Sequence, residues 1–141
     1  MENSMLKAGL KKIPARSIPT LNQAPAPGEF CRESILGPHK KSERLKGRKA
    51  DILIGFWDNR IMPIECKVSN SAVNSVKRLN NDAAVKAETW VRDFGQIQVV
   101  PTAVLSGVYK LHNLVNAQQR GLTLFWVHNL RALVNWIEAT R

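Results

Sequence analysis

Residues 50–68, ADILIGFWDNRIMPIECKV, carry the strongest structural signal in the chain. Residues 51–56 and 61–68 are two runs rich in apolar and β-branched side chains, and Trp-Asp-Asn-Arg lies between them. Runs of this length and composition favour strands, and a polar tetrapeptide with Asp and Asn favours a turn. The segment therefore predicts an antiparallel β-hairpin.

The two faces of this hairpin are predicted to differ in character. Because side chains alternate along a strand, the positions of one parity share a face. The odd positions hold every charge, on Asp51, Glu65 and Lys67, and a loop of three or five residues would set Asp51 directly opposite Glu65. The even positions are all apolar and are expected to pack on a core: Ile52, Ile54, Phe56, Met62, Ile64, Cys66 and Val68.

The remaining sequence predicts an α/β fold of the α+β kind, with a mixed sheet. Residues 1–27 hold four of the seven prolines and are expected to form an irregular basic lead-in, while residues 28–141 form one domain. Apolar spacings of three and four predict a helix over 71–94, ended by Gly95. A strand–helix–strand order implies a crossover connection and helices on the faces of the sheet. The other expected elements are helices at 29–36, 110–119 and 130–140 and strands at 97–105 and 122–127.

Composition limits the class of protein. A chain of 141 residues with 44% hydrophobic side chains has the size and apolar content of one packed domain. Lys and Arg number 21 against 11 Asp and Glu, so the formal charge of +10 favours a polyanionic partner. Two cysteines are too few for a disulfide framework or a four-cysteine zinc site. No apolar run approaches the ~18 residues of a membrane span, so we expect a cytoplasmic protein without membrane contact.

The charged face of the hairpin suggests a metal site. Two carboxylates a few ångströms apart repel each other, and a hard divalent cation such as Mg²⁺ relieves that repulsion. The simpler alternative is a cross-strand salt bridge between Lys67 and either Asp51 or Glu65. Glu-x-Lys alone is weak support for a site, but here it lies inside an apolar strand, and the preceding strand begins with Asp on the matching face. This combination favours the functional interpretation.

These residues resemble a known nuclease pattern. Asp51, thirteen intervening residues and Glu65-Cys66-Lys67 fit the PD-(D/E)XK motif, although Ala50 stands in place of its Pro. From residue 33 onward, ESILGPHKKSERLKGRKADI and IECKVSNSAVNSVKRLNNDAAVKAETW resemble the C-terminal part of XamI-type type II restriction endonucleases. This resemblance implies a restriction-endonuclease-like core of helix, strand meander, crossover helix and strand, extended by a C-terminal helix, strand and helix. Residues 28–141 would be the nuclease domain.

The resemblance also implies an activity and roles for individual residues. The protein would be an endonuclease that hydrolyses phosphodiester bonds in double-stranded DNA with one or two Mg²⁺ ions, for which Mn²⁺ would substitute. Asp51 and Glu65 would bind the metal, and Lys67 would orient the attacking water and stabilise the developing negative charge. Glu33 on the first helix would be a third acidic ligand, with Glu29 as the spare. A homodimer and a cognate DNA methyltransferase in the same system are the implied partners.

Two groups of residues are candidates for contact with DNA. The basic run at 39–49 leads directly into Asp51, and the polar start of the helix after the second strand could bind phosphate, although capping or a solvated loop would explain either group. The candidates are Lys40, Lys41, Arg44, Lys46, Arg48, Lys49, Asn70, Ser71, Asn74, Lys77 and Arg78.

Two other functions stay open. On the same fold, the chain could be a repair nuclease or a junction resolvase. In a different class, it could be a basic nucleic-acid-binding module without catalysis, or a decayed fragment. Mg²⁺-dependent nicking of a plasmid separates the nucleases from the passive module.

Overall fold

A computed structural model describes residues 1–38, 47–71 and 76–141 of the chain. The sheet that spans them has seven strands in the order β1-β3-β4-β5-β6-β7, and β2 pairs with β3 beside β1. The elements in chain order are α1 (Glu2–Lys7), β1 (Lys11–Lys12), β2 (Ser17–Ile18), η1 (Leu21–Gln23), β3 (Glu29–Leu36), β4 (Arg48–Gly55), β5 (Ile61–Ser69), η2 (Val76–Ala83), α3 (Ala84–Phe94), β6 (Thr102–Gly107), α4 (Leu111–Gln119), β7 (Thr123–Trp126), η3 (Val127–Asn129) and α5 (Leu130–Ala139).

The predicted hairpin forms the centre of a mixed sheet. β3, β4 and β5 are an antiparallel meander, whereas β5, β6 and β7 are parallel neighbours. Helix α3 and the π-helix η2 make the crossover between β5 and β6, as the strand–helix–strand order predicts. The mixed α/β class expected from the sequence is confirmed.

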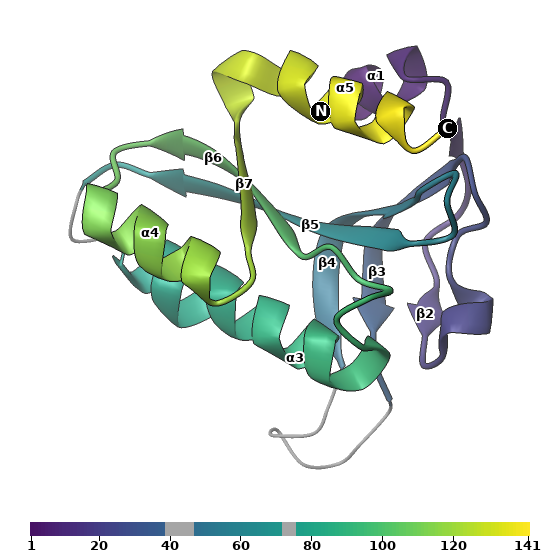
Figure 1. Ribbon diagram of the computed structural model, residues 1–141, viewed down its shortest axis with the longest axis horizontal. Helices are drawn as coiled ribbons and strands as arrows, with labels where there is room; N and C mark the ends of the chain where they lie inside the picture. Colours follow the sequence, from purple (N-terminus) through teal and green to yellow (C-terminus); the bar gives the residue numbers. More distant parts are fainter. Residues whose placement is uncertain (39–46, 72–75) are drawn as a thin grey trace.

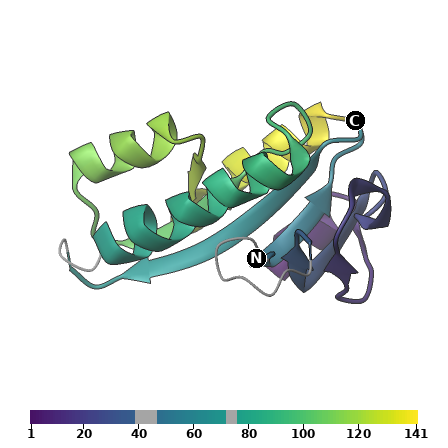
Figure 2. The same ribbon diagram turned by 90° about the horizontal axis from the view of Figure 1, so that it is seen from below.

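Helices cover both faces of the sheet (Figure 1, Figure 2). On one face, α1 and α5 pack on the even-numbered side chains of the hairpin, such as Ile54 and Met62. On the other face, α3 and its neighbours cover Leu53 and a second group of apolar side chains. Sheets that are buried on both faces are typical of this kind of mixed architecture. In the described part of the chain, no helix has the length and apolar character needed to cross a bilayer.

The prediction of a helix at 29–36 is wrong, because this segment forms strand β3. It pairs antiparallel with β4 from Phe30↔Ile54 to Leu36↔Arg48. Phe30, Cys31 and Leu36 are fully buried, so the strand places apolar side chains on both of its faces. Its partner β4 is the next element along the chain, and pairing within the sheet overrides a weak local preference.

The prediction that residues 1–27 are irregular is also wrong in part. These residues include α1, β1 and β2, and Met5, Ala8 and Ile18 are fully buried in the same core as the hairpin. The lead-in passes close to β4, since a Cβ built on Gly55 would lie 2.4 Å from the carbonyl oxygen of Ala26. Residues 1–27 are therefore packed on the domain rather than leading into it.

The remaining differences concern where elements begin. The helix predicted over 71–94 consists of the π-helix η2 and then α3, with Gly95 as its C-cap, and residues 72–75 lie outside the described residues. The strand predicted at 97–105 is regular only from 102 to 107, as β6. Cys66, expected in the core, is exposed. This is because the core under helices α1 and α5 includes β5 residues only as far as Ile64. Beyond Ile64, the described pairing partner of β5 is β6 and no longer β4.

Candidate active site

Asp51 and Glu65 meet where β4 and β5 separate. The two strands are paired from Gly55↔Ile61 to Ile52↔Ile64, and the same register continued by one residue sets Asp51 opposite Glu65. This is the arrangement that a five-residue loop predicts. At that point, the backbone N–H of Cys66 donates a 2.7 Å hydrogen bond to Oδ2 of Asp51. At the end of the β4–β5 ladder, the Asp51 side chain thus accepts the hydrogen bond that a backbone carbonyl would accept in regular pairing.

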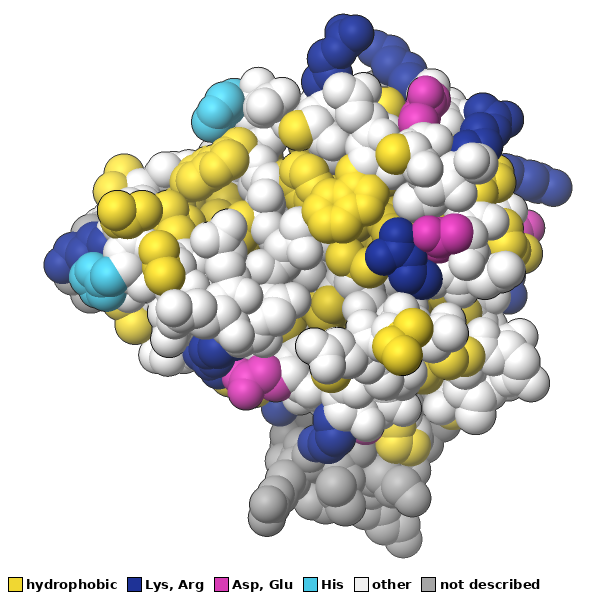
Figure 3. Space-filling view, viewed as in Figure 1, with side chains coloured by type: hydrophobic (Ala, Val, Ile, Leu, Met, Phe, Trp, Pro, Cys, Tyr) yellow, Lys and Arg dark blue, Asp and Glu magenta, His cyan; other side chains and the backbone are white. Residues whose placement is uncertain are grey.

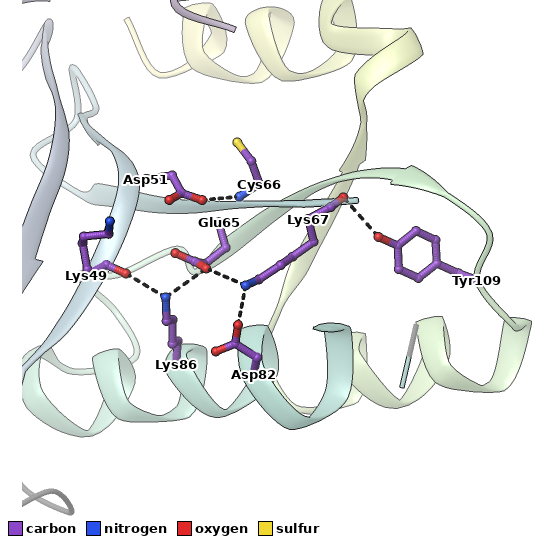
Figure 4. Close-up of polar contacts among 8 residues, drawn as sticks. All are labelled: Lys49, Asp51, Glu65, Cys66, Lys67, Asp82, Lys86 and Tyr109. Carbon is purple, nitrogen blue, oxygen red and sulfur yellow. Dashed lines mark hydrogen bonds and ion pairs between the residues drawn. The ribbon is translucent and has the colours of Figure 1, made fainter. Parts of the chain in front are cut away.

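Glu65 is a buried carboxylate with two ammonium neighbours. The residue is 1% exposed, and its Oε2 lies 3.3 Å from Nζ of Lys67 and 3.0 Å from Nζ of Lys86 (Figure 4). Its Oε1 is buried and has no hydrogen-bond partner among the described residues. Burial raises the pKa of Glu65 above its ordinary value, and the charge of Asp51 acts in the same direction, while Lys86 and Lys67 oppose them.

Lys67 is held between two carboxylates. Its ammonium donates to Asp82 on η2 and contacts Glu65, and its backbone carbonyl accepts a 3.1 Å hydrogen bond from the hydroxyl of Tyr109. Burial disfavours the charged form of Lys67, but the hydrogen bond to Asp82 and the nearby carboxylates together raise its pKa. The ammonium is therefore fixed, charged and 14% exposed beside Glu65.

Two site residues come from the crossover helix, and the sequence reasoning missed both. Asp82 contacts Lys67, and Lys86 contacts Glu65 and donates a 3.2 Å hydrogen bond to the carbonyl oxygen of Lys49 on β4. These positions are four residues apart, so they follow one another along one side of a helix. Helical periodicity identifies such residues only as part of a polar face. The available signal in the sequence was an Asp and a Lys four residues apart, in the helix that follows the charged strand.

The donor set fits a hard divalent cation. Asp51 and Glu65 supply carboxylate oxygens from neighbouring strands, and Oε1 of Glu65 is a buried acceptor without a described partner. Mg²⁺ commonly binds through one or two carboxylates and keeps several of its waters. Over the described ranges, no group of three or more His, Cys, Asp or Glu could hold a metal together. Asp51 and Glu65 are therefore the carboxylates that would hold such a cation.

The two candidates for a third acidic ligand lie on β3 and not on a helix. Glu33 is exposed, has a left-handed φ of 51°, and lines a cavity of about 560 Å³ together with Asp51 and Cys66. Glu29 accepts a 2.8 Å hydrogen bond from the backbone N–H of Ala26 and so stabilises a turn. Glu33 is therefore the nearer of the two to Asp51, and its role as a ligand stays a prediction.

The candidate DNA-binding residues that the structure describes fall on both sides of the site. Lys77 and Arg78 are exposed on η2 and line a cavity of about 720 Å³ with Lys67, Asn81 and Asp82. On the opposite side, β4 begins with half-buried Arg48 and exposed Lys49. Asn70 and Ser71 directly follow the end of β5, where Ser69 pairs with Gly107 of β6. Lys40, Lys41, Arg44, Lys46 and Asn74 lie outside the described residues.

The basic side chains are unevenly distributed over the surface. Figure 3 shows one face of the molecule, on which hydrophobic side chains gather in the middle and Lys and Arg lie mainly toward the edge. A phosphate backbone is bound by Lys and Arg. The cavity beside η2 is better suited to bind a phosphate backbone than the middle of this face is, because Lys67, Lys77 and Arg78 line it.

Comparison with known proteins identifies relatives in one family. The sequence model of a family described as XamI restriction endonuclease matches residues 1–126. The type II restriction enzyme XamI from Xanthomonas campestris pv. amaranthicola is 50% identical over 97 residues. That match covers 69% of this chain and 32% of the relative, so the chain spans about a third of the length of the curated protein that it matches.

One solved structure supports the fold. Protein VC1899 from Vibrio cholerae superposes with a TM-score of 0.59 at 19% sequence identity, over 84% of this chain and 30% of that one. A likeness at this identity concerns the fold alone. The fold is restriction-endonuclease-like, in agreement with the expectation from the sequence.

Proposed function

Because the chain belongs to the XamI restriction endonuclease family, we propose that it is a type II restriction-type endonuclease that hydrolyses phosphodiester bonds in double-stranded DNA with Mg²⁺. The observation that supports this most directly is the apposition of Asp51, Glu65 and Lys67, with Oε1 of Glu65 buried and without a described partner. A carboxylate pair and an ammonium at the splayed end of a hairpin have the chemistry that phosphodiester hydrolysis needs.

Each residue would have a distinct role. One or two Mg²⁺ ions held by Asp51 and Glu65 would activate water and neutralise charge on the phosphate, and Mn²⁺ would substitute. Lys67 reaches the same site from β5, and its fixed ammonium can donate hydrogen bonds to the attacking water or to a phosphate oxygen. Asp82 holds that ammonium in place. Glu33 would support Asp51 from the neighbouring strand.

Contact with DNA would be made by basic and polar residues around the site. Lys77 and Arg78 line the cavity beside Lys67, and Lys49 lies at the start of β4 on the other side. Phosphates bound on both sides would centre the scissile bond on Asp51 and Glu65. We also expect a homodimer, since a two-fold DNA site is matched by a two-fold protein, and a cognate methyltransferase in the same system.

The test is cleavage of a supercoiled plasmid by the purified chain. With Mg²⁺ we expect nicked and linear products, and with EDTA none. Glu65→Gln should eliminate these products. Glu138→Gln makes the same chemical change at an exposed position on α5 and should leave them unchanged. Binding of DNA without any Mg²⁺-dependent product would instead favour a non-catalytic nucleic-acid-binding module.

The pattern of products distinguishes the kinds of nuclease. A restriction-type enzyme should cut a long linear DNA into discrete fragments, because cleavage follows a recognition sequence. A junction resolvase should prefer a four-way junction to the matching linear duplex, and a repair nuclease should prefer a damaged duplex. Discrete fragments from undamaged linear DNA are the expected result.

A further inference from the structure

The side chain of Lys86 contacts the candidate metal site through Glu65. It extends from α3, is 17% exposed, and its Nζ lies 3.0 Å from Oε2 of Glu65. Its second partner is the carbonyl oxygen of Lys49, 3.2 Å away on β4, two residues before Asp51. Lys86 thus reaches both strands that carry the paired carboxylates (Figure 4).

The two ammoniums beside Glu65 are not equivalent. Lys67 also pairs with Asp82, so its charge is shared between two carboxylates. Among the described residues, Lys86 has one carboxylate partner, Glu65, and its other partner is a neutral carbonyl. The charge of Lys86 therefore acts on the Asp51–Glu65 pair to a greater degree than that of Lys67 does.

Charge balance explains what Lys86 does in the protein without metal. Asp51 and Glu65 lie opposite each other, and Glu65 is almost completely buried. Two neighbouring carboxylates in such a place need a compensating positive charge. A divalent cation bound at Oε1 of Glu65 would supply that charge, and it would then lie near the ammonium on Oε2 and be repelled by it.

We propose that Lys86 is an internal counter-cation of the Asp51–Glu65 pair, which stabilises the protein without metal and weakens its affinity for divalent cations. This inference rests on the proposed metal-dependent function, because it takes the same two carboxylates as the ligands. Lys86 is then a positioning residue whose charge sets how much free metal the site requires. The site would fill only where the metal competes successfully with the ammonium.

The proposal is tested by substitutions that separate charge from hydrogen bonding. Lys86→Gln removes the charge and keeps a hydrogen-bond donor, and Lys86→Arg keeps both. Lys110→Gln is the matched control, because Lys110 is exposed and the net charge changes by the same amount. Ca²⁺ is the probe. Its affinity is measured by titration calorimetry without DNA, and the unfolding temperature is measured with and without Ca²⁺.

Lys86→Gln should bind Ca²⁺ about tenfold more tightly than the unmodified chain, because one repulsive charge is removed. It should also unfold at a lower temperature without Ca²⁺ and gain more from saturating Ca²⁺. Lys86→Arg and Lys110→Gln should match the unmodified chain in both measurements. Unchanged or weaker binding by Lys86→Gln overturns the inference alone. Absence of Ca²⁺ binding by every variant, including the unmodified chain, overturns the proposed function as well.

Discussion

The backbone N–H of Cys66 donates a 2.7 Å hydrogen bond to Oδ2 of Asp51, and this bond joins β4 to β5 at the point where their regular pairing ends. One side chain therefore has two tasks. It terminates the ladder, and it supplies a carboxylate at the position opposite Glu65 in the strand register. The splayed end of the hairpin is built by the same residue that would bind the metal.

Substitution of Asp51 should separate these two tasks. Asn at position 51 still has an oxygen that can accept from Cys66, whereas Ala has none. We expect both variants to lose Mg²⁺-dependent cleavage, while Asp51→Ala alone loses about 1 kcal/mol of unfolding free energy, the typical net value of one such hydrogen bond. Urea unfolding and plasmid cleavage measure the two effects. Cleavage by Asp51→Asn at the rate of the unmodified chain would disprove its role as a ligand.

Replacement of Lys67 should affect the rate at saturating metal. We expect Lys67→Met to reduce the cleavage rate by about 10²–10³-fold, because one stabiliser of developing charge is commonly worth that much. Its charge is already shared with Asp82, so Ca²⁺ affinity should change less than in Lys86→Gln. Single-turnover cleavage over a range of Mg²⁺ concentrations gives both quantities.

Asp82→Asn is the companion measurement for Lys67. The Asp82 side chain is 45% exposed, so the loss of this ion pair should change the unfolding free energy by less than about 1 kcal/mol. The rate should fall less than in Lys67→Met, because the ammonium keeps its contact with Glu65. A Lys67→Met variant within threefold of the unmodified chain would show that the Glu-x-Lys pattern has no catalytic role here.

The hairpin could be predicted because its signals are local. Alternation of apolar residues identifies two strands, but the register depends on the loop length, and the structure has the five-residue loop that sets Asp51 opposite Glu65. The same local logic failed for β3. The sequence EFCRESIL has no clear period, and its strand state depends on pairing with β4. Lys86 and Asp82 were missed for a related reason, since the face of a helix that meets a sheet depends on tertiary packing.

Cys66 shows where alternation alone is insufficient. The even face of β5 is apolar throughout, yet its burial ends once α1 and α5 no longer cover it. The odd face is charged at Glu65 and Lys67, yet Glu65 is buried under the crossover helix. Which residues share a face follows from sequence, but which face is covered follows from the lengths and positions of the helices.

Glu33 provides a test of backbone strain near the site. Its φ of 51° lies in the left-handed region, where Gly has no steric penalty. We expect Glu33→Gly to keep or raise the unfolding free energy, by up to about 1 kcal/mol. Because Glu33 is exposed and Asp51 and Glu65 remain in the variant, cleavage should fall less than tenfold. Thermal unfolding and plasmid cleavage measure these effects, and loss of all activity with an intact fold would instead establish Glu33 as an essential ligand.

Lys77 and Arg78 test whether DNA lies along η2. Both are exposed and line the cavity that also contains Lys67, so phosphates bound there would lie next to the candidate site. We expect Lys77→Gln and Arg78→Gln to weaken binding similarly for all DNA sequences, in the presence of Ca²⁺. Each lost phosphate contact should lower the slope of log affinity against log salt by about one.

Fluorescence anisotropy with a labelled duplex at several salt concentrations gives these slopes, with Lys110→Gln as the control for net charge. The double variant should lose about two units of slope, whereas the control should keep the slope of the unmodified chain, because a charge that touches no phosphate releases no counterion. In cleavage assays, the double variant should need more DNA to reach half of its maximal rate and keep most of that rate. An unchanged slope would mean that DNA does not reach the cavity beside η2, and the phosphate contacts would then have to be sought on the β4 side, at Arg48 and Lys49.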